Sequence, residues 1–198
     1  MNPPAWPTVA ELAASGEGWL RLSNINLSDQ ERNDVEQIMT PWMRRHCPQV
    51  NAGENKRRIA SVSAKSVQLQ ATQPKQLAVT EMGDWEGDSG SCPCGRNLNC
   101  RIWVLSLSGD RATTLLEYSG FGLVVLKSSS HGFSDIVTAS IAGVRRIEIR
   151  TWRFDGKQYA LLRCAVERYS LGRINSDAPI DDIDKTGRIS EHPCKPSQ

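Results

Sequence analysis

The chain of 198 residues lacks any apolar run of the roughly 18 to 20 residues that a membrane-spanning helix needs. It also lacks an excess of one charge, since 24 lysines and arginines face 22 aspartates and glutamates and leave a net charge of +2. The strongly basic surface of a nucleic-acid-binding protein is therefore not expected. These absences favour a protein that neither spans a membrane nor binds nucleic acid.

Familiar catalytic motifs are missing as well. No H-E-x-x-H metal motif, no glycine-rich phosphate loop and no G-x-S-x-G turn occurs in the chain. The run from Gly87 to Gly90 resembles the loop around the nucleophile of chymotrypsin-like proteases, with Ser89 in the nucleophile position. However, only about 40 residues separate Ser89 from His46, too few to complete one barrel and begin another. We therefore expect neither a serine protease nor a bound cofactor.

The cysteines occur without any C-x-x-C pair. There are six, spread from end to end of the chain: Cys47, Cys92, Cys94, Cys100, Cys164 and Cys194. An even number in this arrangement indicates disulfides formed in an oxidising compartment. The expected pairs are Cys94–Cys100, Cys47–Cys164 and Cys92–Cys194. The protein is accordingly expected in the periplasm or outside the cell, and its signal peptide, which is not visible in this chain, is expected to have been removed.

Metal sites are the alternatives in the cysteine-rich region. Zinc would have four soft ligands available, namely Cys92, Cys94, Cys100 and either His46 or Cys47. Structural zinc sites generally use wider C-x2-4-C spacings than the C-x-C found here. Weak candidates for calcium are Asp84, Glu86 and Asp88, but the later bidentate glutamate of an EF-hand is absent. We expect disulfides and a solvated acidic loop, with no metal.

One helix is signalled clearly near the N-terminus. Ser28 is a good N-cap residue, and Glu31 completes a capping box three residues later. Apolar residues follow at helical spacing, at Val35, Ile38, Met39 and Trp42. Pro41 is expected to kink or end this amphipathic helix.

From residue 101 the pattern changes to short strands separated by turn residues. The expected strands are 101–107, 113–118, 122–126, 135–140, 146–152 and 159–166. Regular short strands of this kind favour an antiparallel sheet. The predicted fold is α+β: an N-terminal amphipathic helix packed on an antiparallel β-meander of six or more strands, stapled by disulfides. Residues 1–20 are expected to form an arm, 21–170 a single domain, and 171–198 a tail tied down by a disulfide.

Three segments carry a resemblance to known proteins: "NCRIWVLSLSGD", "GFSDIV" and "WRFDGKQYALLRC". In this order they resemble a group of uncharacterised exported bacterial proteins that share a Cys-x5-Cys loop, a Gly-x-x-Asp-Ile-Val segment and a Phe-Asp-Gly-x-x-Tyr hairpin. The resemblance covers roughly residues 90 to 168 and implies an exported protein. Residues 132–137 also resemble the start of an FG-GAP repeat, although the chain has strands for about two sheets, whereas a propeller needs at least four blades.

We expect the protein to be an exported, non-enzymatic binding, inhibitor-like or accessory-subunit protein that acts through its loops and an aromatic arm. Partner contacts are expected at Trp6, Trp19 and Trp85, which lie in irregular segments. The partner would be another protein or a cell-envelope component. The alternative is a hydrolase or metal-dependent enzyme whose site is assembled from distant residues. A cleft that holds His131, Asp135 or the loop 84–88 with a second charged partner would favour the enzyme.

Overall fold

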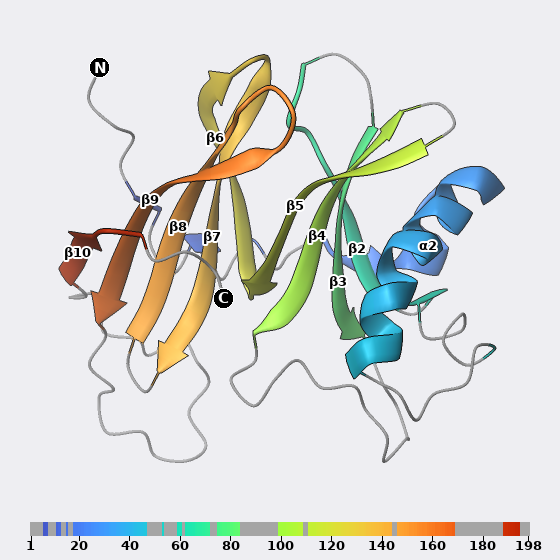
Figure 1. Ribbon diagram of the computed structural model, residues 1–198, viewed down its shortest axis with the longest axis horizontal. Coiled ribbons are helices and arrows are strands. Elements are labelled where there is room, and N and C mark those ends of the chain that lie inside the picture. Colours follow the sequence, from blue (N-terminus) through green and yellow to red (C-terminus); the bar gives the residue numbers. More distant parts are fainter. Residues whose placement is uncertain are drawn as a thin grey trace.

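The fold is α+β, with a long helix packed on antiparallel sheets (Figure 1). The structure is a computed structural model that describes residues 6–7, 11–12, 15, 18–46, 53, 59–60, 62–71, 75–83, 99–108, 111–143, 146–168 and 188–194. The elements along the chain are β1 (Leu20–Arg21), η1 (Leu22–Asn24), α2 (Asp29–His46), β2 (Val62–Val67), β3 (Lys75–Gly83), β4 (Cys100–Ser108), β5 (Arg111–Gly120), β6 (Gly122–Ser130), β7 (Phe133–Gly143), β8 (Arg146–Phe154), β9 (Tyr159–Arg168) and β10 (Arg188–His192). They form two five-stranded sheets, in the orders β1-β2-β3-β4-β5 and β10-β9-β8-β7-β6. The predicted fold class is confirmed.

The capping box at the start of α2 is present as predicted. The backbone N–H of Glu31 donates to Ser28 Oγ at 3.2 Å, and the Ser28 N–H donates to Glu31 Oε2 at 2.7 Å. These bonds satisfy two groups that the first turn of a helix cannot pair internally. The helix does not end at Pro41 but continues to His46.

The two faces of the first sheet are covered differently. One face packs against α2, whose buried residues are Val35, Met39 and Met43, in a core that includes Leu77, Val79, Trp103 and Leu105. The other face packs against the second sheet, in a core that includes Ile102, Val104, Leu116, Tyr118, Ile136, Trp152 and Phe154. The first sheet is therefore the middle of three layers, with α2 on one side and β6–β9 on the other (Figure 1).

The chain changes sheets within one residue, at Phe121 between β5 and β6. The Phe121 N–H donates to the Ala139 carbonyl oxygen at 2.9 Å, so the crossover is held against β7. A short distance away, the Asn99 side chain bonds both backbone groups of Ile141, with Nδ2 donating to the carbonyl at 2.9 Å and Oδ1 accepting from the N–H at 2.8 Å. The start of β4 and the crossover are thus both tied to the last part of β7.

The disulfide pattern differs from the expected one. Cys164 of β9 is bonded to Cys194, with 5.2 Å between their Cα atoms. The expected pairs Cys47–Cys164 and Cys92–Cys194 are therefore wrong. The reason is that β10 pairs with β9 and places His192 opposite Cys164, so that Cys194 arrives only two residues later.

Cys100 is also disulfide-bonded. Because Cys164 and Cys194 bond each other, its partner is one of Cys47, Cys92 and Cys94, which lie outside the described residues. The pair Cys94–Cys100 remains a prediction. None of the described cysteines is free, and this pattern points to an oxidising compartment.

We predict that Gly120→Ala destabilises the protein strongly, because a Cβ at this position would lie 2.1 Å from the Ala139 carbonyl oxygen. Either the crossover or β7 must move, and we expect a loss of more than about 2 kcal/mol of unfolding free energy. Gly18→Ala is the control: its φ of +78° is strained for alanine, but nothing lies within 4 Å of the added carbon. This control should lose only about 1 kcal/mol in the same chemical denaturation experiment. Equal losses would contradict the role given to the crossover.

We also predict that the double variant Cys164→Ser/Cys194→Ser is less stable than the parent protein. The disulfide closes a sequence separation of 30 residues. In the chain-entropy model, a loop of this length contributes about 3.5 kcal/mol. Chemical denaturation of both proteins under non-reducing conditions measures the difference. A double variant as stable as the parent would show that strand pairing alone holds β10 in place.

Candidate functional site

The aromatic arm packs against the second sheet. The half-buried Trp6 donates from Nε1 to Glu191 Oε1 at 3.1 Å, and the Arg163 guanidinium lies 4.5 Å from the centre of its ring. Arg163 also pairs with Glu191, and its hydrogen bond, together with that of Trp6, holds the pKa of Glu191 below its ordinary value. Trp6 therefore joins β9 and β10 through its contacts with Arg163 and Glu191.

Trp19 is likewise occupied by contacts within the chain. Its Nε1 donates to the Ser15 carbonyl at 3.2 Å, and its ring packs on the core between the sheets. The ammonium of Lys65 lies 5.8 Å from the centre of that ring. Trp85, the third predicted partner contact, lies outside the described residues. Partner binding by these three tryptophans remains a prediction.

Asp135 is a buried charge with internal partners. Its side chain is fully buried, accepts a hydrogen bond from Ser128 Oγ at 2.9 Å and forms an ion pair with Arg153 at 3.0 Å. The hydrogen bond from Arg153 to Asp135 raises the pKa of that guanidinium. Because a buried carboxylate is tolerated only when it is paired and hydrogen-bonded, this arrangement ties β6, β7 and β8 together.

His131 lies at the β6–β7 turn and is held by a contact of its own. Its Nδ1 is 3.1 Å from the Phe154 carbonyl oxygen, and its φ of 50° is in the left-handed region. The nearby Asp155 accepts hydrogen bonds from the N–H groups of Gln158 and Lys157, which lower its pKa. Thus His131 and Asp135, both suggested as parts of an enzyme site, each make contacts that hold neighbouring strands together.

No group of three or more metal-binding side chains occurs within the described residues. The weak calcium candidates Asp84, Glu86 and Asp88, and the cysteines of the zinc alternative other than Cys100, lie outside them. In the same described part of the chain, no helix is long and apolar enough to cross a membrane.

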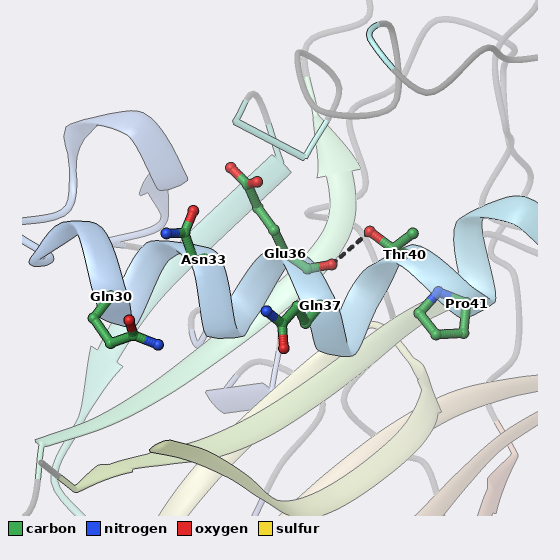
Figure 2. A pocket seen from close by; sticks show the side chains of 6 residues that line it. All are labelled: Gln30, Asn33, Glu36, Gln37, Thr40 and Pro41. Atoms are coloured by element: carbon green, nitrogen blue, oxygen red, sulfur yellow. Dashed lines mark hydrogen bonds between the residues drawn. The ribbon is translucent and has the colours of Figure 1, made fainter. Parts of the chain in front are cut away.

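A groove of about 390 Å³ runs along the exposed side of α2 (Figure 2). Its lining residues share one helix and are mostly uncharged: Gln30, Asn33, Glu36, Gln37, Thr40 and Pro41. The side chains of Asn33 and Gln37 are exposed and have no hydrogen-bond partner in the described part of the protein. Each carries an amide that both donates and accepts hydrogen bonds. The groove can therefore bind a polar ligand without attracting a particular charge.

Pro41 gives the groove a further hydrogen-bond acceptor. Proline has no N–H, so residue 41 cannot donate to the carbonyl of Gln37 four residues earlier, as an ordinary helical residue would. The neighbouring Glu36 carbonyl accepts a bond from Thr40 Oγ1 at 2.6 Å (Figure 2). The sequence indicated Pro41 only as a helix breaker. The signal that was missed is the spacing of three or four residues between Gln30, Asn33, Gln37 and Pro41, which places all four on the same exposed side of the helix.

Glu167 is a second buried carboxyl, without the partners that Asp135 has. It lies on β9 in register with Ile147 and Ile189, is 9% exposed, and its Oε2 has no hydrogen-bond partner among the described residues. Burial raises its pKa. The carboxyl group of Glu167 therefore binds a proton more tightly in the folded protein than in the unfolded chain. The corresponding stability is fully present below the unfolded-state pKa of about 4.3 and is lost as the pH rises through the folded-state pKa.

We predict that Glu167→Gln removes this part of the pH dependence. The variant should be more stable than the parent at neutral pH, because it carries no buried charge, and the difference should shrink as the pH falls through the raised folded-state pKa of Glu167, reaching its smallest value below about 4.3. Denaturant titrations at several pH values measure it. Glu117→Gln, at a more exposed glutamate of β5 that pairs with Arg101, is the contrasting variant: it loses an attraction and should not be more stable than the parent at neutral pH. A gap between Glu167→Gln and the parent that widens on acidification would contradict the prediction.

No protein-family model, no curated protein and no solved structure matches this chain. The resemblance of residues 90–168 to exported bacterial proteins therefore remains a prediction.

Proposed function

We propose that the protein is an exported, non-enzymatic binding or accessory protein that holds a partner protein in the groove of α2. A disulfide between Cys164 and Cys194 supports an oxidising compartment, and the periplasm or the extracellular space is the proposed location. The family suggested by residues 90–168 is part of this proposal. Loops are proposed to add further contacts, with Trp85 among them.

The observation that carries the proposal is the presence of Pro41 inside α2, on the wall of the groove. Proline in a helix interior costs about 3 kcal/mol relative to alanine. Local rules of this kind are commonly broken at functional sites, where another benefit offsets the loss. Here the benefit is a backbone carbonyl at Gln37 that Pro41 leaves without its usual helical donor, next to side-chain amides that have no partner within the described chain.

The chemistry of the groove fits a polypeptide. Backbone amides of an extended segment present N–H and C=O groups at short intervals. The Gln37 carbonyl and the amides of Asn33 and Gln37 supply acceptors and donors for both kinds of group. With Glu36 as the single charged residue among those that line the groove, there is little to attract a strongly charged small molecule.

The test is site-specific photo-crosslinking in cells that produce the protein. A benzophenone amino acid placed at Gln37 should give a discrete adduct with a partner protein, whereas the same group at Lys157, an exposed residue of the β8–β9 turn, should not. Adducts of equal yield at both sites, or none at Gln37, would show that the groove is not a docking site.

Pro41→Ala separates binding from folding. We predict that this variant is more stable by about 1–3 kcal/mol, since alanine restores the N–H donor and removes the clash of the ring. The same change should reduce the adduct at Gln37 several-fold. A more stable variant with undiminished crosslinking would contradict the role of the Gln37 carbonyl while leaving the groove itself intact.

A further inference from the structure

The disulfide between Cys164 and Cys194 has basic side chains on both sides. Cys164 of β9 is directly opposite Arg150 of β8 and directly opposite His192 of β10. These three strands lie side by side in the second sheet (Figure 1). Directly opposite side chains leave the same face of a sheet, with their Cβ atoms about 4.5–5.5 Å apart. The side chain of Cys164 is therefore flanked by a guanidinium group and an imidazole.

Both neighbours of Cys164 have a buried nitrogen without a hydrogen-bond partner among the described residues. These atoms are Nε of Arg150 and Nε2 of His192. A different nitrogen of Arg150, Nη2, donates to Glu148 at 2.7 Å, so the ion pair leaves Nε unused. Nδ1 of His192 is 2.9 Å from the Pro193 carbonyl oxygen, and it carries the hydrogen because a carbonyl only accepts. In the neutral imidazole, Nε2 is therefore a lone pair that can take up a proton.

We propose that the bond between Cys164 and Cys194 is a redox-active disulfide, in which Arg150 and His192 stabilise the Cys164 thiolate that forms on reduction. A guanidinium group beside a cysteine favours its thiolate, and so does a histidine that has taken up the thiol proton. Apolar burial acts in the opposite direction, and these two neighbours offset it. The disulfide lies on the second sheet, whereas the groove lies on α2, so this inference stands independently of the proposed function.

The exchange begins at the more exposed sulfur. Cys194 is half-buried and Cys164 is only 2% exposed, so a thiolate of an incoming dithiol attacks Cys194. A bond forms between the dithiol and Cys194, and the Cys164 sulfur leaves with the electron pair of the broken bond. A better stabilised thiolate leaves faster. The second thiolate of the dithiol then displaces Cys194, which takes a proton from water; two electrons have passed to the protein, and the dithiol has become a disulfide.

The experiment follows the reduction of the folded protein by dithiothreitol, with timed alkylation and peptide mass spectrometry. Cys100 is an internal control, because it is also disulfide-bonded and is as buried as Cys164. We expect the bond between Cys164 and Cys194 to be reduced about tenfold faster than the bond of Cys100, or more. His192→Asn should slow this reduction several-fold. Arg146→Gln should not, because this exposed arginine lies four residues from Arg150 along β8.

The contribution of Arg150 is tested without leaving a carboxylate unpaired. The double variant Glu148→Gln/Arg150→Gln removes both charges of the ion pair and should slow the reduction. Glu148→Gln alone keeps the guanidinium and should be reduced as fast as the parent or faster. The denaturation midpoints of the oxidised variants show whether each is folded.

A second readout detects the thiolate directly. Cys194→Ser leaves Cys164 as a thiol, and its ultraviolet thiolate absorbance is measured against Cys164→Ser/Cys194→Ser. We expect thiolate at pH 7, where an ordinary cysteine with a pKa of about 8.5 is mainly protonated. The charged and titratable groups beside Cys164 on the flanking strands are Arg150, Glu148 and His192, and adding His192→Asn should remove most of the signal.

Three results would overturn the proposal. The first is reduction of both disulfides together, at the rate at which the protein unfolds. The second is a His192→Asn variant that is folded and reduced as fast as the parent. The third is a Cys164 thiol in Cys194→Ser that is protonated at pH 7 like an ordinary cysteine.

Discussion

The contact between Gly120 and the carbonyl of Ala139 is the constraint on which the two-sheet arrangement depends. β5 must approach β7 closely enough for the next residue, Phe121, to donate to that carbonyl, and the approach leaves no space for a side chain at residue 120. Tyr118, whose hydroxyl donates to the Gly122 carbonyl at 2.8 Å, bridges the same crossover from within the core. Because one residue separates the two sheets along the chain, neither sheet can shift without moving the other.

Both ends of the chain depend on the second sheet that this crossover positions. Trp6 from the N-terminal arm contacts Arg163 of β9 and Glu191 of β10, and Cys194 is bonded to Cys164 of β9. The last strand is therefore held by backbone pairing, an aromatic contact and a covalent bond. A sheet with its outer strand fixed in this way presents a constant surface.

The parts of the fold that could be predicted from the sequence are those governed by near neighbours. The capping box of Ser28 and Glu31 spans three residues, and the strands from β4 to β9 follow from alternation and turn residues. The pairing of Cys164 with Cys194 could not be predicted, because it depends on β10, whose residues 188–192 carry little strand signal and find β9 only through tertiary contacts. The change of sheet at Phe121 could not be predicted either, since Ser119-Gly120 is typical of an ordinary turn.

The groove was missed for a different reason: the sequence shows that Pro41 interrupts helical hydrogen bonding, but not that this interruption faces solvent.

The bond between Cys164 and Cys194 also decides what a break in the chain would do. The connection from β9 to β10 runs from Arg168 to Arg188, and both cysteines lie outside it, one on each side. A protease that cut this connection would produce two polypeptides, yet β10 would stay joined to β9 through sulfur. In an oxidising medium the cleaved protein would keep its last strand, and it would lose that strand only where thiols are kept reduced.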